Sequence, residues 1–144
     1  MKSLKEAVEN AKRVYLCGNG GSAANAIHIA NDLISVGVKA QALVDISTVT
    51  AIGNDFGYRY IFSKQIEVFG EEGDLLICLS GSGNSPNIIE ALYTAKDKGM
   101  ETFVITGGGT AWELSDGILT DTKMQPSEEA QLIAGHDVML ALRG

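Results

Sequence analysis

The sequence predicts an α/β protein, with a parallel β-sheet and helices on both of its faces, and three observations support that prediction. Short apolar runs typical of strands alternate with segments of helical periodicity along the chain. The strongest run, at residues 74–79, is continuous in the way that central parallel strands are. Three of the expected strands end in glycine-rich turns, and the carboxyl ends of parallel strands share one edge of a sheet. We therefore expect ligand chemistry at that edge.

The first half of the chain alternates helix and strand. Apolar residues at helical spacing predict a short helix over residues 3–12, and the apolar run at residues 14–17 predicts a buried strand. A glycine turn then leads into an alanine-rich helix over residues 22–34. Residues 40–44 predict a second strand, whereas residues 46–56 are polar and loop-like, with room for one helical turn.

The second half repeats this alternation. Its apolar runs predict three strands, at residues 74–79, 102–106 and, as an edge strand, 117–120. Its helical segments lie at residues 58–69, 86–98 and 127–143. The helix at 86–98 has the clearest start signal, because Pro86 stands at the first helical position directly after Ser85.

Length, composition and charge limit the class of protein. At 144 residues the chain is expected to form a single domain, residues 1–144, and its 45% hydrophobic and 20% charged residues are typical of a soluble globular protein. No apolar run reaches the roughly 18 residues of a membrane span, and the N-terminus resembles an amphipathic helix rather than a signal peptide. A net charge of −7 without a basic cluster argues against direct nucleic-acid binding. Cys17 and Cys78 lie in strand-like runs and are expected to be buried free thiols of a cytoplasmic protein.

The first glycine turn has the features of an anion site. Residues 18–21 (Gly-Asn-Gly-Gly) follow a predicted strand and precede a predicted helix, with Ser22 as its expected N-cap. Glycines let the backbone come close to a ligand, free N–H groups point outward, and the helix dipole favours negative charge. His28 and Asp32 follow on one face of the same helix, at i, i+4 spacing. One element thus carries a phosphate cradle and a candidate acid/base or metal pair.

Three kinds of phosphate site compete for this turn. A Walker A loop is excluded, because no glycine turn is followed by Lys-Ser/Thr. A dinucleotide site fits loosely, since residues 18–23 match G-x-G-x-x-A and Asp45 ends the next strand. A small phosphorylated metabolite also explains the second turn, residues 80–85 (Ser-Gly-Ser-Gly-Asn-Ser), whose three hydroxyls lead into a helix N-terminus. The alternative is that these serines only stabilise the turn and cap the following helix.

Four motifs occur in order along the chain, at residues 18–28 (GNGGSAANAxH), 50–58 (TAIGNDFGY), 62–65 (FSxQ) and 80–87 (SGSGNSPN). Together they closely resemble the sugar isomerase (SIS) domain family, and within it the sedoheptulose 7-phosphate isomerases (phosphoheptose isomerases), over nearly the whole chain from Val14 onward. The resemblance implies a flavodoxin-like three-layer α/β/α sandwich, usually a homotetramer with active sites shared between subunits, although a dimer is an alternative. It also implies bound Zn²⁺ and an aldose–ketose isomerisation. That reaction converts sedoheptulose 7-phosphate through an enediol to D-glycero-D-manno-heptose 7-phosphate, a precursor of lipopolysaccharide or capsule.

The resemblance also assigns roles to individual residues. The expected substrate-binding residues are Asn19, Ser22, Asp55, Ser80, Ser82, Ser85 and Glu128. The expected metal ligands are His28, Asp32, Glu128 and His136. An isomerisation through an enediol needs a base that moves a proton between adjacent carbons and a group that polarises the carbonyl. By resemblance, Asp32 and His136 are the acid/base candidates.

Two of these positions depart from the family pattern. Asp32 is one methylene shorter than the family's glutamate, and Glu128 replaces a neutral glutamine. The two changes could compensate each other, because one metal ligand shortens while another gains charge. Helical periodicity by itself favours Glu129, since Glu128 lies about 80° from His136 around a helix that turns about 100° per residue. The family alignment selects Glu128.

These departures leave a second class of function open. It is a non-catalytic phosphosugar-binding or regulatory SIS protein, similar to the DnaA initiator-associating protein, which acts through protein contacts. Asp32 and Glu128 favour this alternative, whereas the two histidines and the complete serine loop favour the isomerase.

Overall fold

Five parallel strands form the central sheet of the computed structural model, which describes residues 3–120 and 128–143. The strands are β1 (Val14–Gly18), β2 (Ala40–Ala42), β3 (Leu75–Ser80), β4 (Glu101–Thr106) and β5 (Gly117–Thr120). Their order in the sheet is β2-β1-β3-β4-β5, and every neighbouring pair is parallel. This is the flavodoxin-like order, so the predicted fold class is confirmed.

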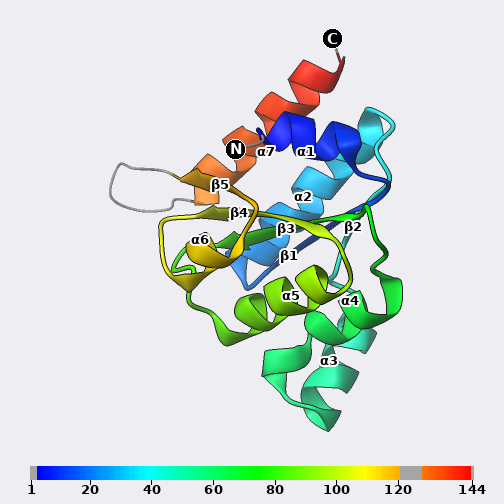
Figure 1. Ribbon diagram of the computed structural model, residues 1–144, viewed down its shortest axis with the longest axis vertical. Coiled ribbons are helices and arrows are strands. Elements are labelled where there is room, and N and C mark those ends of the chain that lie inside the picture. Colours follow the sequence, from blue (N-terminus) through cyan, green and yellow to red (C-terminus); the bar gives the residue numbers. More distant parts are fainter. Residues whose placement is uncertain (1–2, 121–127, 144) are drawn as a thin grey trace.

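Helices cover both faces of this sheet (Figure 1). On one face lie α1 (Leu4–Asn10), α2 (Gly21–Ser35) and α7 (Glu128–Arg143). On the other lie α3 (Ile46–Asp55), the 3₁₀ turn η1 (Tyr58–Tyr60), α4 (Ser63–Phe69), α5 (Pro86–Asp97) and α6 (Thr110–Leu114). Within the described residues, no helix is both long and apolar enough to cross a membrane.

The sheet separates two hydrophobic cores. All residues of β1 and β3 are buried, as expected for central parallel strands that are covered on both faces. Because successive strand side chains point to opposite faces, Leu16 packs toward α1, α2 and α7, whereas Cys17 packs toward α4 and α5. The carboxyl edge of the sheet is thereby held between two packed layers.

The two cysteines face each other in the second core. Cys17 of β1 and Cys78 of β3 are direct neighbours in the strand register, and their Sγ atoms lie 3.5 Å apart. Both are buried free thiols, as the sequence predicts. Burial, together with the adjacent Cys17, raises the pKa of Cys78 well above its ordinary value, which keeps this thiol protonated and unreactive.

The predicted loop at residues 46–56 is wrong, because Ile46–Asp55 form the helix α3. Its β-branched residues and Gly53 lower helix propensity, which is why the sequence pattern is weak. Asp45 offsets this weakness as the N-cap, since its carboxylate accepts hydrogen bonds from the Thr48 backbone N–H (3.1 Å) and hydroxyl (2.8 Å). Packing of α3 against the second core adds further stabilisation to this helix.

Other boundaries also differ from the prediction. Ser22 does not cap α2; the cap is Gly20, at φ 56°, a conformation that glycine adopts without strain. The helix expected over residues 58–69 divides into η1 and α4. The strand β2 ends at Ala42, and α6 was not expected. These differences fall between the strands or at their ends, whereas the five strands and the long helices agree with the sequence pattern.

Candidate active site

The two glycine-rich loops lie side by side at the carboxyl edge, because β1 and β3 are neighbours and Gly18 pairs with Leu79. An asparagine pair joins them. Asn19 of the first loop and Asn87 of α5 exchange two amide hydrogen bonds, of 2.9 and 2.8 Å. The Tyr58 hydroxyl donates a third, of 2.8 Å, to Asn19 Oδ1. Since Asn87 is only 2% exposed, this contact fixes the first loop to the start of α5.

The serine loop is held from within. The Ser80 hydroxyl accepts from the Gly83 N–H and the Ser82 hydroxyl from the Asn84 N–H, each at 3.1 Å. Accepting leaves each hydroxyl its own proton to donate to an anion. Ser85 stands at the N-cap of α5, and its side chain makes no capping hydrogen bond. The loop therefore offers hydroxyl donors next to a helix N-terminus.

A cavity of about 450 Å³ opens at the start of α5. Its lining residues are Asn19, Tyr58, Arg59, Ser85, Pro86 and Asn87. Its volume falls in the range of small-molecule sites, roughly 300–1,000 Å³. The predicted phosphate residues Asn19 and Ser85 thus share a cavity of suitable size.

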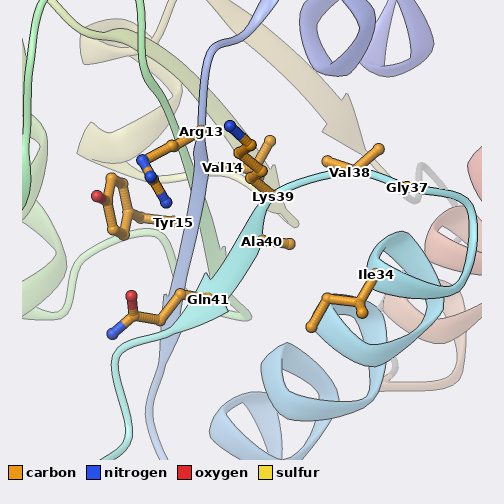
Figure 2. A pocket seen from close by; sticks show the side chains of 9 residues that line it. All are labelled: Arg13, Val14, Tyr15, Ile34, Gly37, Val38, Lys39, Ala40 and Gln41. Carbon is orange, nitrogen blue, oxygen red and sulfur yellow. The ribbon is translucent and has the colours of Figure 1, made fainter.

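A second hollow, of about 420 Å³, lies at the opposite end of β1 and β2 (Figure 2). Arg13 lies just before β1, Val38 and Lys39 lie just before β2, and Ile34 lies on α2. Among the described residues that line it, none is a predicted site residue. Because ligands of open α/β sheets bind at the carboxyl edge, we place the site at the loops instead.

A histidine–aspartate cluster forms between α2 and α7. The Nε2 atoms of His28 and His136 lie 2.9 Å apart, and Asp32 Oδ2 lies 3.5 and 3.1 Å from them, respectively. The two imidazoles are about half exposed, whereas Asp32 Oδ2 is enclosed and makes no hydrogen bond among the described atoms. Three donor atoms thus converge on one point from two helices.

This donor set fits a divalent metal ion. The ligand atoms of His28, Asp32 and His136 all lie within 4.8 Å of one another. Two imidazole nitrogens and a carboxylate oxygen are ligands that zinc accepts, and the enclosed Oδ2 has no hydrogen-bond partner among the described atoms. Glu129, which periodicity favours, is described and lies outside this group. The side chain of Glu128, at the first position of α7, lies outside the described residues.

A buried polar seam holds α7 against α2. The Gln131 side chain accepts from Asn25 Nδ2 (2.8 Å) and donates to the Ser22 hydroxyl (3.2 Å), and Gln131 is only 2% exposed. Gly135 lets the helices approach closely, since a Cβ there would lie 2.5 Å from Ile29 Cγ1. The predictions missed Gln131 and Asn25, although a lone glycine within a helical pattern is a signal of close packing.

The structure therefore divides most of the predicted residues into two groups. Asn19, Ser80, Ser82 and Ser85 lie on the two loops, and His28, Asp32 and His136 form the cluster. Ser22 belongs to the seam between them, where it bonds Gln131. Asp55 joins neither group within the described chain, because it is exposed at the end of α3 and its carboxylate accepts from the Asn54 side chain at 3.2 Å.

The structure argues against a dinucleotide site, because Asp45, the acidic residue that would bind the ribose, has another role. The Thr48 hydroxyl, and then the Thr48 backbone N–H, lower the pKa of the Asp45 carboxyl below its ordinary value. This carboxylate is thus committed to the cap of α3 rather than to a ribose.

A flavodoxin-like sheet with two donor-rich loops at its carboxyl edge places this chain in a class, the α/β sandwiches that can bind a small ligand at that edge. Residues 1–107 match the family model described as SIS domain. The chain belongs to this SIS domain family and, within it, to the phosphoheptose isomerases.

Three relatives illustrate the similarity. The chain is 43% identical to the phosphoheptose isomerase of Aneurinibacillus thermoaerophilus, over 91% of this chain and 72% of that protein. It is 42% identical to that of Glaesserella parasuis over 78% of this chain, and spans 63% of that relative's length. The structure of a phosphoheptose isomerase from Francisella tularensis superposes with a TM-score of 0.90 at 31% identity, covering 96% of this chain and 82% of that chain.

Proposed function

We propose that this protein is an aldose–ketose isomerase that converts sedoheptulose 7-phosphate to D-glycero-D-manno-heptose 7-phosphate through an enediol. The observation that carries the proposal is the convergence of His28, Asp32 and His136 in a chain with the phosphoheptose isomerase motifs. These residues supply both a proton acceptor and ligands for a carbonyl-polarising metal ion. The coarser activity, sugar-phosphate isomerisation, is the activity named for the relatives.

The loops are proposed to bind the phosphate end of the substrate. Ser80, Ser82 and Ser85 donate hydroxyl protons to its oxygens, and the N-terminus of α5 adds a favourable dipole. Asn19, held by Asn87, keeps the first loop in register with them. Asp55 and Glu128 are proposed to contact sugar hydroxyls.

The cluster is proposed to carry out the proton transfer. Asp32 takes the proton from the carbon next to the carbonyl and returns it to the neighbouring carbon, while His136 exchanges a proton with the oxygens. His28 lies against both groups and keeps them in place. A zinc ion held by His28, Asp32, His136 and Glu128 would polarise the carbonyl and so acidify that proton.

Proton NMR of the purified protein with sedoheptulose 7-phosphate, with zinc and then with a chelator, tests this activity. We expect new anomeric signals that require the metal. The variant His136→Ala is expected to abolish turnover and to leave binding of the sugar phosphate largely intact. A sugar spectrum that broadens on binding and never changes in composition would contradict the proposal.

The second candidate function is a non-catalytic phosphosugar-binding or regulatory protein. The geometry of the cluster favours it, because two Nε2 atoms at 2.9 Å can share a hydrogen bond and Asp32 pairs directly with both rings. Such a cluster could hold α7 on α2 without chemistry. Binding of sugar phosphate without turnover, in the same NMR experiment, would favour this function.

We further propose that the protein is cytoplasmic and forms a homo-oligomer, a tetramer rather than a dimer. Exposed apolar side chains on α2 and α7 support association into an oligomer, since Ile27 and Ile34 are 51% and 55% exposed and Ile133 and Leu140 are 59% and 56% exposed. Light scattering after size exclusion is expected to give four times the chain mass of 15.2 kDa. A mass equal to one chain would contradict this assembly.

A further inference from the structure

The cavity at the start of α5 contains one charged residue to which the proposed function gives no role. Among the described residues that line it, Arg59 alone carries a charge. Arg59 follows Tyr58 on η1, and Tyr58 contacts the first loop through Asn19. Ser85, one of the proposed phosphate donors, lines the same cavity. Arg59 therefore shares a cavity with part of the proposed phosphate site.

Arg59 is held by an acidic residue of α5. Its Nη2 and Nε lie 2.8 and 2.9 Å from the same oxygen of Glu90, Oε1. A guanidinium has five N–H donors, so this contact leaves others available. The Arg59 side chain is 57% exposed, and ion pairs of such exposure are weak. The partner of Arg59 can thus be exchanged at little cost.

A cation here would neutralise phosphate charge that the two loops leave uncompensated. The two loops contain glycine, serine and asparagine but no lysine, and the chain has a net charge of −7. Hydroxyl and N–H donors satisfy phosphate oxygens without neutralising their charge. Arginine does both, because its planar fork matches a phosphate through paired charge-assisted hydrogen bonds.

We propose that Arg59 is a substrate-binding residue that exchanges Glu90 for the phosphate group of the sugar phosphate. This inference rests on the proposed function, because it assigns the ligand of the same site. A neutral sugar has no charge with which to compete against Glu90 for the guanidinium. Arg59 and Glu90 together therefore discriminate phosphorylated from unphosphorylated sugars.

Calorimetric titration with sedoheptulose 7-phosphate, inorganic phosphate and unphosphorylated sedoheptulose tests the exchange. In Arg59→Gln we expect affinity for both phosphate ligands to fall by about tenfold or more, as for the loss of a charge-assisted hydrogen bond. In Glu90→Gln we expect the affinity for both phosphate ligands to rise about two- to fivefold, since the ion pair that competes for Arg59 is gone. Affinity for the unphosphorylated sugar should be the same in both variants.

Lys5→Gln is the matched control, because it removes one positive charge from an exposed pair with Glu9 on α1, in the opposite helix layer. Phosphate affinity in Lys5→Gln should stay close to that of the wild type.

If the wild type turns over sedoheptulose 7-phosphate and Arg59→Gln binds it as tightly as the wild type does, the inference about Arg59 fails and the proposed function stands. If the wild type binds no sugar phosphate, the inference about Arg59 and the proposed function both fail. Weaker phosphate binding in Glu90→Gln would overturn the exchange, even if Arg59→Gln did not fold.

Discussion

Asp32 is the central residue of the histidine cluster, since the enclosed Oδ2 of its carboxylate faces both imidazole rings. We predict that Asp32→Asn, which removes the charge and keeps the volume, lowers zinc affinity by about 100-fold or more, because losing a direct ligand should cost more than the roughly 10–100-fold effect of losing a group that only supports a ligand. Asp32→Glu keeps the charge and is expected to retain most of the affinity. Competition with a chromophoric chelator measures both, and equal affinity in Asp32→Asn and the wild type would contradict this role.

Asp45 gives the protein a pH-dependent cap. Its pKa is lowered from an ordinary value of 3.8, so its ionised form stabilises the folded state. This contribution is complete above pH 3.8 and is lost as the pH falls through the lower folded-state pKa. We predict that Asp45→Ala is less stable than the wild type at neutral pH and that the difference narrows in that acid range. Urea unfolding at several pH values checks this, and Thr48→Val, which removes the main hydroxyl donor, should weaken the same dependence.

Asn87 ties the two loops together, and its loss should affect both stability and binding. We predict that Asn87→Ala lowers the free energy of unfolding by about 1–3 kcal/mol, because it removes two hydrogen bonds between the Asn19 side chain and a buried Asn87. Tyr58→Phe is the control, since it removes one bond from a side chain that is 62% exposed. Urea denaturation compares them. A cost for Asn87→Ala no larger than that for Tyr58→Phe would contradict a locking role.

Among the elements, α3 shows why part of the fold escaped prediction. Strands such as β3 and helices such as α2 have runs and periods long enough to be recognised from the sequence alone. In α3 the intrinsic propensity is low, and the helix depends on one capping carboxylate and on packing of Val49 and Ile52 against the second core. Such tertiary packing is invisible in a local pattern.

The close packing of α2 and α7 yields a prediction at Gly135. A Cβ there would meet Ile29 Cγ1 at 2.5 Å, so we expect Gly135→Ala to cost about 1–3 kcal/mol of stability and to weaken zinc binding by separating the helices. Gly53→Ala is the matched control, since its Cβ would meet only Ile61 at 3.6 Å and should stabilise α3 by about 0.5–1 kcal/mol.

A double-mutant cycle separates this contact from other effects. In Ile29→Ala the obstructing atoms are gone, so adding Gly135→Ala should cost much less than it does in the wild type. Additive losses in the cycle would show that the Gly135 effect arises elsewhere in α7.

At the scale of the whole molecule, the loops were more predictable than the contacts between distant segments. The glycine and serine loops can be recognised from the sequence because their residues are consecutive and follow predicted strands. The bonds from Asn87 and Tyr58 to Asn19, and from Gln131 to α2, join residues from 39 to 109 positions apart. Their pairing depends on the strand order and on where α7 packs, which periodicity does not specify. The pairing of His28 and Asp32 with His136 came from family resemblance for the same reason.

Zinc binding should therefore stabilise the fold as a whole, because its proposed ligands join α2 to α7 across 108 positions of sequence. A ligand that binds only the folded state adds about 2.7 kcal/mol when its concentration is 100 times its Kd. We predict that zinc raises the melting temperature of the wild type and that excess chelator reverses the rise. In His136→Ala the rise should disappear, whereas magnesium, which prefers oxygen ligands, should have little effect on either protein. Differential scanning fluorimetry measures all four combinations of protein and metal. An equal zinc-dependent rise in His136→Ala would place the ion elsewhere and leave the cluster as a hydrogen-bonded clamp between the two helices.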